Sequence, residues 1–294
     1  MIVGALGTLL CFAITPVFAQ GAMERLGSIA ANFWRLLVAV LLLGGWTWIF
    51  GSRVSPAVEV WLLLGGVAGF GVGGAALFLS LPGLGASLST LVVQCGAVAA
   101  AVAIEWLWLE RSLTYFQLLS VIIIVGGVAL GLLPRSWPVS RSHFHAGFAW
   151  AVVSAIGQGA GAVISRKAFV LAAAQRCVVD PGTAAFIRAI GGLIVATLWF
   201  AILSALRRAE PRATRSAWRW VLANAITGPV LGVTCYQWAL RSAPAALVQP
   251  IVAAAPLLTV PLAIAIGDAP RPRLTYYAGT ALAVAGTALL LLAR

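Results

Sequence analysis

The stretch "LVQPIVAAAPLLTVPL", residues 247–262, is as apolar as a membrane-spanning helix, yet it contains three prolines. Each proline lacks a backbone N–H and clashes with the preceding helical turn, at a cost of about 3 kcal/mol in a helix interior. Spanning helices tolerate prolines where neighbouring helices, polar side chains or water satisfy the freed carbonyls. We therefore expect a bent helix beside a hydrated path, with Pro250, Pro256 and Pro261 as kink and gating residues. A static packing bend is the alternative.

Long apolar runs recur along the whole chain. Of its 294 residues, 62% are hydrophobic and only 9% are charged, whereas soluble domains contain about 25% charged residues. So few charges cannot cover the surface of a soluble fold, and the bilayer is therefore the expected solvent. A span needs about 20 mostly apolar residues. This rule predicts ten spans, at 2–20, 29–50, 60–80, 85–107, 114–133, 146–166, 183–206, 217–240, 244–266 and 275–293.

The second half of the chain repeats the first, with chance similarity among helices rich in Leu, Ala and Gly as the alternative. The sequence "ANFWR" at 31–35 matches "AAFIR" at 184–188, and "FLSLPGLGASL" at 78–88 aligns without gaps on "QWALRSAPAAL" at 237–247. The preceding helices also correspond, with Trp61 on Trp220, Gly69 on Gly228 and Gly73 on Gly232. Because five is an odd number, a second copy of five spans must enter from the opposite face. We predict an all-α membrane protein of ten transmembrane helices in two inverted five-helix repeats, 1–133 and 146–294, with a connecting loop at 134–145.

Each half ends in an acidic turn followed by "LT" and a last helix that contains glycine. The two motifs are "WLWLERSLT" at 106–114 and "IGDAPRPRLT" at 266–275. With ten spans in two halves, this pattern resembles the EamA-like family of the drug/metabolite transporter superfamily. The resemblance implies a secondary transporter with both termini inside the cell. The chain departs from the family pattern in two places: the fourth span has "QCGAVAAA" at 94–101 without a proline, and Asp268 replaces a glutamate.

Neutral polar side chains form stripes on five of the predicted spans. In the sixth span, Ser154, Gln158 and Ser165 recur at helical spacing, and the repeat alignment places Thr15 on Gln158. Polar groups within a span are costly unless they face a partner or water. We therefore predict a central cavity; hydrogen bonding between helices, worth about 0.6–2 kcal/mol per contact, is the alternative. The predicted substrate-binding residues are Thr15, Gln94, Ser154, Gln158, Asn224, Thr234, Trp238 and Gln249.

Two further patterns, one of glycines and one of arginines, lie within the predicted spans. Gly65, Gly69 and Gly73 are spaced four residues apart, which allows close backbone approach between helices. We expect a packing role for them, with helix sliding during transport as the alternative. Arg35 and Arg188 occupy matching positions, and we expect both to extend to lipid headgroups. Attraction of an anionic substrate group is the alternative.

The titratable residues restrict the function further. Glu105, near the end of the fourth span, is the acid closest to a span centre. We therefore favour facilitated diffusion or exchange of a neutral or zwitterionic solute, with coupling through Glu105 as the alternative. Both histidines, His143 and His145, lie in the connecting loop, and the chain has no HExxH or CxxC motif, so we expect no enzymatic activity, metal or cofactor. Apart from Arg35 and Arg188, the basic residues behind the net charge of +12 lie at or between span ends, which argues against nucleic acid as a partner.

The predicted function is export of a small, amino-acid-like polar metabolite across a bacterial inner membrane by alternating access. A flippase for a lipid-linked headgroup and a membrane scaffold without flux are the alternatives. The expected partners are a small-molecule substrate and the lipid bilayer, with the protein as a monomer or homodimer. The face away from the termini carries more Lys and Arg, which places the termini outside by the positive-inside rule, whereas the family resemblance places them inside.

Overall fold

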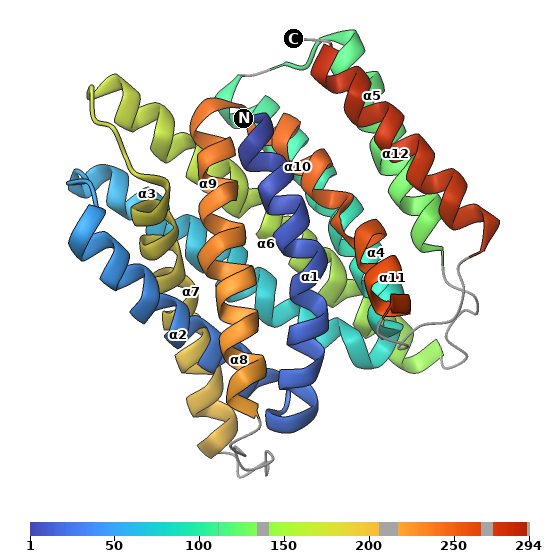
Figure 1. Cartoon of the computed structure of the whole chain (residues 1–294), viewed down its shortest axis with the longest axis horizontal. Helices are drawn as coiled ribbons and strands as arrows, with labels where there is room; N and C mark the ends of the chain where they lie inside the picture. Colours follow the sequence, from blue (N-terminus) through green and yellow to red (C-terminus); the bar gives the residue numbers. More distant parts are fainter. Residues whose placement is uncertain (111, 134–140, 206–216, 266–272, 293–294) are drawn as a thin grey trace.

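The computed structural model describes residues 1–110, 112–133, 141–205, 217–265 and 273–292, which form helices and the turns that join them. Figure 1 shows a bundle in which the first helix begins and the last helix ends at the same end of the molecule. We refer to this end as the terminal end and to the opposite one as the distal end. Residues 134–140 of the connecting loop, Glu210 and Asp268 lie outside the described residues.

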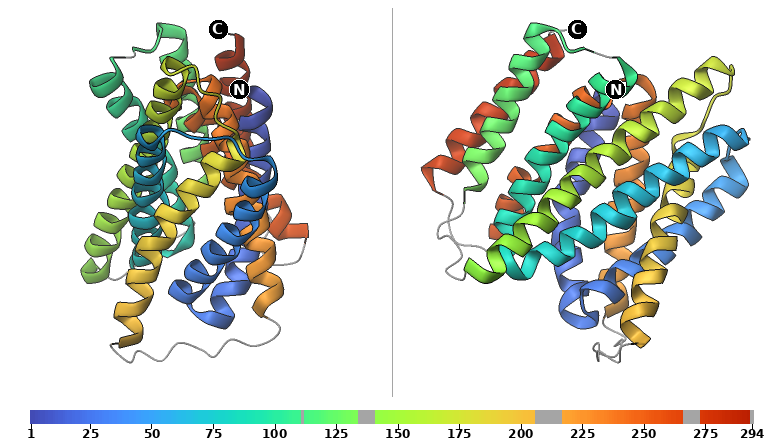
Figure 2. Two further views of the ribbon diagram at one scale, coloured as in Figure 1. Left: turned by 90° about the vertical axis from the view of Figure 1, so that its left-hand side faces the viewer. Right: turned by 180° about the vertical axis from the view of Figure 1, so that it is seen from behind.

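The first half contains five spans. They are built from α1 (Ile2–Leu26), α2 (Ser28–Phe50), α3 (Pro56–Gly66), the π-helix η1 (Val67–Gly73), α4 (Gly74–Leu109) and α5 (Tyr115–Leu132). The helices α3 and η1 and the start of α4 form one span, Pro56–Ser80, and Leu88–Leu109 of α4 forms the next. A straight helix as long as α4 would reach about 54 Å, well beyond the roughly 30 Å hydrocarbon core of a bilayer. The chain therefore changes direction within α4, as Figure 2 shows.

The second half is built from a matching series of helices. They are α6 (Arg141–Ala174), α7 (Pro181–Ala205), α8 (Ala217–Ala225), the π-helix η2 (Ile226–Gly232), α9 (Val233–Ser242), α10 (Ala245–Ala253), α11 (Ala255–Ala265) and α12 (Leu274–Leu292). Across the described residues, nine segments are long and apolar enough to cross a membrane. The remaining expected span, 217–240, is the continuous helical run α8–η2–α9, which is uncharged between Arg219 and Arg241 and contains the polar residues Asn224 and Gln237.

The ninth expected span is bent, as its prolines predict. The helix is interrupted at Ala254, between α10 and α11. Pro256 explains the interruption, because it has no N–H to donate to the carbonyl of Val252 one turn earlier. Pro250 and Pro261 lie inside α10 and α11 without interrupting them. The structure therefore places a helix break at one of the three prolines, and the gating role of all three stays a prediction.

The carbonyl that Pro261 leaves free has a partner on another helix. Pro261 cannot donate to Leu257 O, and the Tyr276 hydroxyl of α12 donates to that oxygen instead, at 2.6 Å. Tyr276→Phe is therefore expected to destabilise the protein by about 1–3 kcal/mol, because a buried carbonyl loses this donor. Tyr277→Phe, at the exposed neighbour, should change stability by less than about 0.5 kcal/mol. Thermal unfolding of both variants in one detergent measures the difference, and equal midpoints would contradict the assignment.

Buried apolar residues join the helices differently at the two ends of the bundle. One large cluster connects the starts of α1, α3 and α7 with the ends of α6 and α9 and with α10 toward the terminal end, and it continues along α5, α11 and α12 to Leu132 and Tyr276. All nine residues of α10 are buried. Toward the distal end, one cluster joins α1, α2 and α8, and a separate cluster joins α4 and α6. The described packing therefore buries α10, toward the terminal end, along its whole length.

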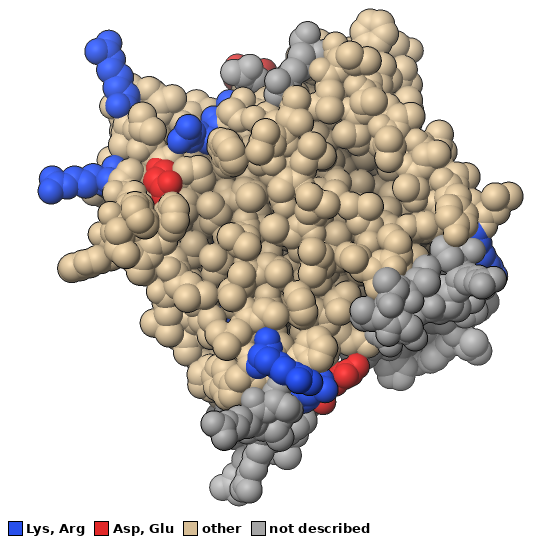
Figure 3. Space-filling view, viewed as in Figure 1, with Lys and Arg blue, Asp and Glu red and all other residues tan. Residues whose placement is uncertain are grey.

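The outer surface suits a lipid environment. Figure 3 shows charged side chains at opposite edges of one face, with an uncharged band between them. Large aromatic side chains near helix ends are exposed, with Trp48 91%, Trp106 61% and Tyr115 76% exposed. Exposed Trp and Tyr at helix ends are typical of membrane–water interfaces. The chain is therefore a multi-pass membrane protein.

Candidate functional site

The two halves meet through the first helix of each. The hydroxyl oxygens of Thr15 in α1 and Thr227 in η2 lie 3.3 Å apart, within hydrogen-bond distance. Ser154 of α6 donates to the carbonyl of Gly73 in η1 at 2.7 Å, and the Gln158 amide donates to Ser154 at 3.2 Å. The first helix of each half therefore hydrogen-bonds the π-helix of the other half. We call these two places the crossing contacts.

The two π-helices occupy equivalent places in the sequence. The alignment that pairs Gly69 with Gly228 and Gly73 with Gly232 matches η1 and η2 from end to end. The π-helix η1 is rich in glycine and η2 contains Pro229, so neither segment favours a regular α-helix. π-helical turns are rare and occur frequently at functional sites. Each crossing contact thus combines polar side chains with an irregular helix.

The glycine stripe allows α3 and η1 to approach α6 and α7 closely. A Cβ on Gly65 would lie 2.7 Å from Ser165 Oγ, and a Cβ on Gly73 would lie 3.1 Å from Gln158 Cγ. On Gly69, between them, a Cβ would lie 3.0 Å from Arg188 Nη2. Side chains larger than hydrogen do not fit at these positions without displacement of a neighbour. The predicted packing role of the stripe is confirmed.

The remaining predicted residues of α4, α8 and α9 have different surroundings. Asn224 is buried, and its Oδ1 accepts no hydrogen bond in the described part of the chain. A Cβ on Gly228 would lie 3.6 Å from both this oxygen and Thr15 Oγ1, so Asn224 lies beside the α1–η2 crossing contact. Gln94 and Thr234 are half-buried. Trp238 is 44% exposed, so much of its ring faces the surroundings of the protein.

A second polar group lies toward the terminal end, centred on Arg188 of α7. Arg188 is 3% exposed and donates to Gly161 O at 3.0 Å and to Ser165 Oγ, both on α6. When the side-chain amide of Gln237 is oriented with its oxygen toward the guanidinium, this oxygen accepts hydrogen bonds from Arg188 Nη1 and Nε at 3.1 and 3.3 Å. The expectation that Arg188 extends to lipid headgroups is therefore wrong, because adjacent helices supply acceptors inside the protein.

Gln249 of α10 belongs to the same group. Tyr236 of α9 donates its hydroxyl to Gln249 Oε1, and both side chains are buried. The Arg188 guanidinium carbon lies 6.0 Å from the centre of the Tyr236 ring. Glu105 of α4 is 1% exposed and accepts the first two backbone N–H groups of α10, at 3.1 and 2.7 Å. The helix α10 is thus held at its N-terminus by a carboxylate and at its middle by a tyrosine. We call the contacts of Arg188, Gln237, Tyr236, Gln249 and Glu105 the terminal network.

The sequence pattern does not predict Tyr236 and Gln237. Extension of the polar stripe from Asn224 at α-helical spacing selects Thr234 and Trp238. The π-helix η2 lies between these positions, and its wider turns contain more residues than α-helical turns, which rotates α9 relative to that extension. Tyr236 and Gln237 are therefore buried, and Trp238 is exposed. The glycines and the proline of 228–232 are the signal that the spacing changes.

The Tyr236–Gln249 bond gives a double-mutant test of the terminal network. Tyr236→Phe is expected to destabilise the protein by about 1–3 kcal/mol, because Gln249 Oε1 stays buried without its donor. In a Gln249→Leu background the same change should cost about 1 kcal/mol less, since the two residues are in contact. Unfolding of the four-member cycle measures the coupling. Tyr236→Phe combined with Tyr277→Phe is the control, and its effects should add. Additive effects of Tyr236→Phe and Gln249→Leu would contradict a hydrogen bond between Tyr236 and Gln249.

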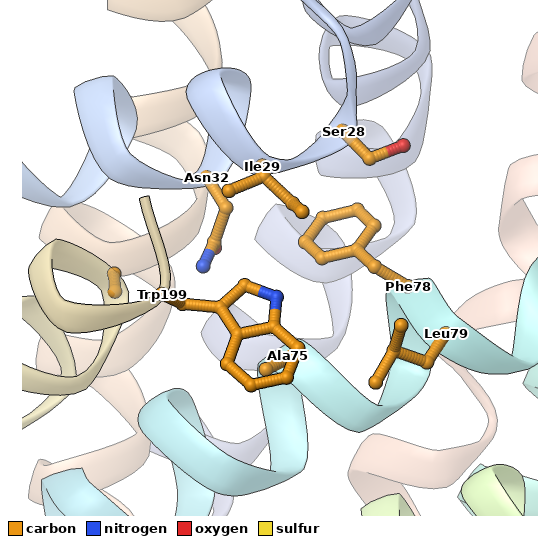
Figure 4. Close-up of a pocket in the computed structure, with 8 residues that line it drawn as sticks. Ser28, Ile29, Asn32, Ala75, Phe78, Leu79 and Trp199 are labelled. Atoms are coloured by element: carbon orange, nitrogen blue, oxygen red, sulfur yellow. The ribbon is translucent and has the colours of Figure 1, made fainter. Parts of the chain in front are cut away.

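A small pocket lies between α2, α4 and α7. Figure 4 shows Ile29, Asn32 and Phe78 arranged around the Trp199 indole. Asn32 also accepts from Nε of Arg35, which is half-buried, at 2.9 Å. The pocket volume is about 70 Å³, whereas ligand pockets usually measure about 300–1,000 Å³. It is too small for a metabolite, and none of the predicted substrate-binding residues lines it; the lining residues are Ser28, Ile29, Asn32, Ala75, Phe78, Leu79, Ala196 and Trp199.

Comparison with known proteins agrees with this architecture. A family model, described as the EamA-like transporter family, matches residues 1–133 and 145–292, and so covers two repeats across the chain. Among curated proteins, no relative matches. A solved structure described only as a crystal structure of a protein shares the fold, with a TM-score of 0.79 at 18% identity over 99% of this chain and 96% of that chain. The chain therefore belongs to the EamA-like transporter family, within the drug/metabolite transporter superfamily.

Proposed function

We propose that the protein is a secondary transporter that exports a small polar, amino-acid-like metabolite across a bacterial inner membrane by alternating access. Its family consists of membrane transporters. The proposed pathway lies between two inverted repeats, 1–133 and 146–294, which are joined through the loop at 134–145. Because one chain supplies both repeats, a monomer is sufficient for transport, and a homodimer would contain two pathways.

Helix directions and contacts support the inverted relation. The helix α1 begins at the terminal end and α6 begins at the distal end, as Figures 1 and 2 show. The first helix of the first half, α1, packs against α8, η2 and α9 of the second half. The first helix of the second half, α6, packs against α3 and η1 of the first half. The pairs α2–α7 and α5–α12, which are equivalent in the alignment, pack against each other. If the two halves are interchanged, each of these contacts is replaced by its equivalent, as a two-fold axis in the membrane plane requires.

The fixing of α10 at the terminal end, beside a break in the same span, is the observation that carries the proposal. Toward the terminal end, one apolar cluster and the terminal network hold α10 against α4 and α9. Toward the distal end, two smaller clusters each join helices from both halves, and the large cluster also reaches Leu132 of α5 and Tyr276 of α12. Alternating access requires that one end is closed while the helices of the other end separate. The interruption at Ala254 is the proposed hinge, with Pro250, Pro256 and Pro261 around it.

The proposed solute contacts come from the polar stripes. Gln94 and Gln158 are half-buried, and an amide left partly open to hydrocarbon would be costly, so water or solute at these side chains is favoured. Thr15 and Thr234 are half-buried as well. Ser154, Asn224 and Gln249 lie behind them in the crossing contacts and the terminal network. Trp238 contributes least, because 44% of its surface is exposed.

Flux measurements test the proposal. Thermal-shift screening of purified protein against amino acids, nucleosides and vitamins selects solutes, and their exchange is then measured in proteoliposomes. Gln158→Leu is expected to reduce flux about tenfold, as loss of one substrate hydrogen bond worth about 1.4 kcal/mol would. Ile156→Leu is the control, because Ile156 is an exposed residue on the same helix. Absence of flux for every solute that stabilises the protein, or equal flux in both variants, would contradict the proposal.

A further inference from the structure

Every group that Arg188 hydrogen-bonds in the described residues is neutral. The guanidinium donates to a carbonyl, a hydroxyl and an amide oxygen, from Gly161, Ser165 and Gln237. The carboxylate of Glu105 accepts the N-terminal amides of α10 and is not a partner of Arg188. The positive charge is therefore spread over dipoles and is not balanced by a hydrogen-bonded carboxylate.

A charge of this kind needs a physical reason. Ionisable groups inside a membrane protein are costly, and they usually mark the path of a solute or ion. A neutral side chain would fill the same space without loss of hydration. The chain instead makes room for the guanidinium, since a Cβ on Gly69 would lie 3.0 Å from Arg188 Nη2. The fold thus holds a desolvated cation that forms no ion pair with the residues described in the structure.

The surroundings of Arg188 suit an oxyanion. The rings of Phe70 and Tyr236 lie 5.1 and 6.0 Å from the guanidinium carbon, and such apolar surroundings strengthen charge-assisted hydrogen bonds. The planar fork of arginine matches a carboxylate or phosphate with two parallel bonds. The Gln237 amide and the Tyr236 hydroxyl are additional donors beside it.

The terminal network covers this position in the present structure. Tyr236 is bonded to Gln249 on α10, and it lies within electrostatic range of both Arg188 and Glu105. A movement of α10 away from α9 and α4 would break the Tyr236–Gln249 hydrogen bond and the hydrogen bonds from the first backbone N–H groups of α10 to Glu105. The Tyr236 hydroxyl would then be free to donate to a solute, and its ring lies 6.0 Å from the Arg188 guanidinium carbon.

We propose that Arg188, with Gln237 and Tyr236, binds the oxyanion of the transported molecule, a carboxylate or a phosphate, in the state open at the terminal end. The proposal rests on the transport function above and narrows its substrate class. A free solute and an anionic lipid headgroup carry the same chemistry, and the two sources are separated by experiment.

The first experiment uses wild-type protein only. Amino acids and their C-terminal amides are compared by thermal shift, because the amide keeps the side chain and the ammonium group and lacks the carboxylate. Inorganic phosphate is the second probe. The acid forms are expected to bind about tenfold more tightly than the amides. Flux separates this inference from the proposed function: equal flux of acid and amide leaves transport intact and counts against the oxyanion site, whereas no flux of either counts against transport.

Variants then assign the preference to Arg188. Arg188→Gln should bind acid and amide alike, Arg188→Lys should keep part of the preference, and Arg35→Gln, at the matching position, should keep all of it. Lipid movement is then measured in vesicles. If wild type moves phosphatidylglycerol but not phosphatidylcholine, and Arg188→Gln moves neither, the site is supported with a lipid headgroup as the source of the oxyanion. Where Arg188→Gln does not fold, Gln237→Leu removes one donor and should weaken the preference for acids. Equal binding of acid and amide by wild type, together with no headgroup-selective lipid movement, overturns the proposal.

Discussion

Gly66→Ala is expected to cause the largest loss of folded protein among the substitutions considered. A Cβ at this position of α3 would overlap the carbonyl oxygen of Arg188 and lie 2.7 and 2.8 Å from its carbonyl carbon and Cα. Because the overlap is with backbone atoms, no change of rotamer relieves it, and α3 must move away from α7. We expect a loss of at least about 3 kcal/mol, against total stabilities of about 5–15 kcal/mol. Fluorescence-detected size-exclusion chromatography of a fusion protein measures the folded fraction.

Gly74→Ala is the matched control for this substitution. Gly74 lies eight residues further along the same span, and a Cβ there would meet no atom within 4 Å. Alanine stabilises a helix interior by about 0.5–1 kcal/mol relative to glycine, so this variant should accumulate at least as well as wild type. Similar yields of folded Gly66→Ala and Gly74→Ala would contradict the close approach of α3 and α7.

Glu105→Leu is expected to produce the second largest loss. Both carboxylate oxygens accept backbone N–H groups at the start of α10, and Glu105 is buried. Hydrogen bonds to a charged group contribute about 1.5–3 kcal/mol each, and the helix N-terminus favours a negative charge. We therefore expect destabilisation by at least about 3 kcal/mol, together with loosening of α10. Thermal unfolding and limited proteolysis measure the two effects.

Two other substitutions separate capping from charge. Glu105→Gln keeps one acceptor oxygen and should lose roughly half as much stability as Glu105→Leu. Glu59→Gln changes an exposed acid in the first turn of α3, where the helix dipole contributes about 0.3–1 kcal/mol. If Glu105→Leu were no more harmful than Glu59→Gln, Glu105 would not hold α10 in place.

The spans follow from local physics and are therefore predictable from sequence. Apolar runs predict spans at 29–50 and 275–293, and the helices α2 and α12 begin and end within one residue of them. The expected end of the sixth span at 166 is wrong, since α6 continues to Ala174. The arginine at 166 resembles a span end, but its guanidinium donates to the carbonyls of Leu240 and Arg241 at the end of α9.

The candidate site is less predictable, because it depends on how helices rotate and pack. The crossing contacts contain Thr15, Ser154 and Gln158, which α-helical spacing identifies correctly as interior positions. Beyond η2 the same spacing fails, and it selects Trp238 in place of Gln237. The burial of Arg188 depends on acceptors from α6 and α9, which are distant in sequence. No pattern within one span contains that information.

Sided cysteine labelling tests the central claim of a pathway closed at the terminal end. Gln158→Cys and Val248→Cys are made in a background without the four native cysteines, and a membrane-impermeant maleimide is applied to one face of sealed vesicles without solute. A protease-cleavable tag after Arg294 identifies the terminal face. We predict that Gln158→Cys reacts from the distal face only, and that Val248→Cys, buried in α10, reacts from neither. Reaction of Gln158→Cys from the terminal face, or of Val248→Cys from that face at a similar rate, would contradict the account.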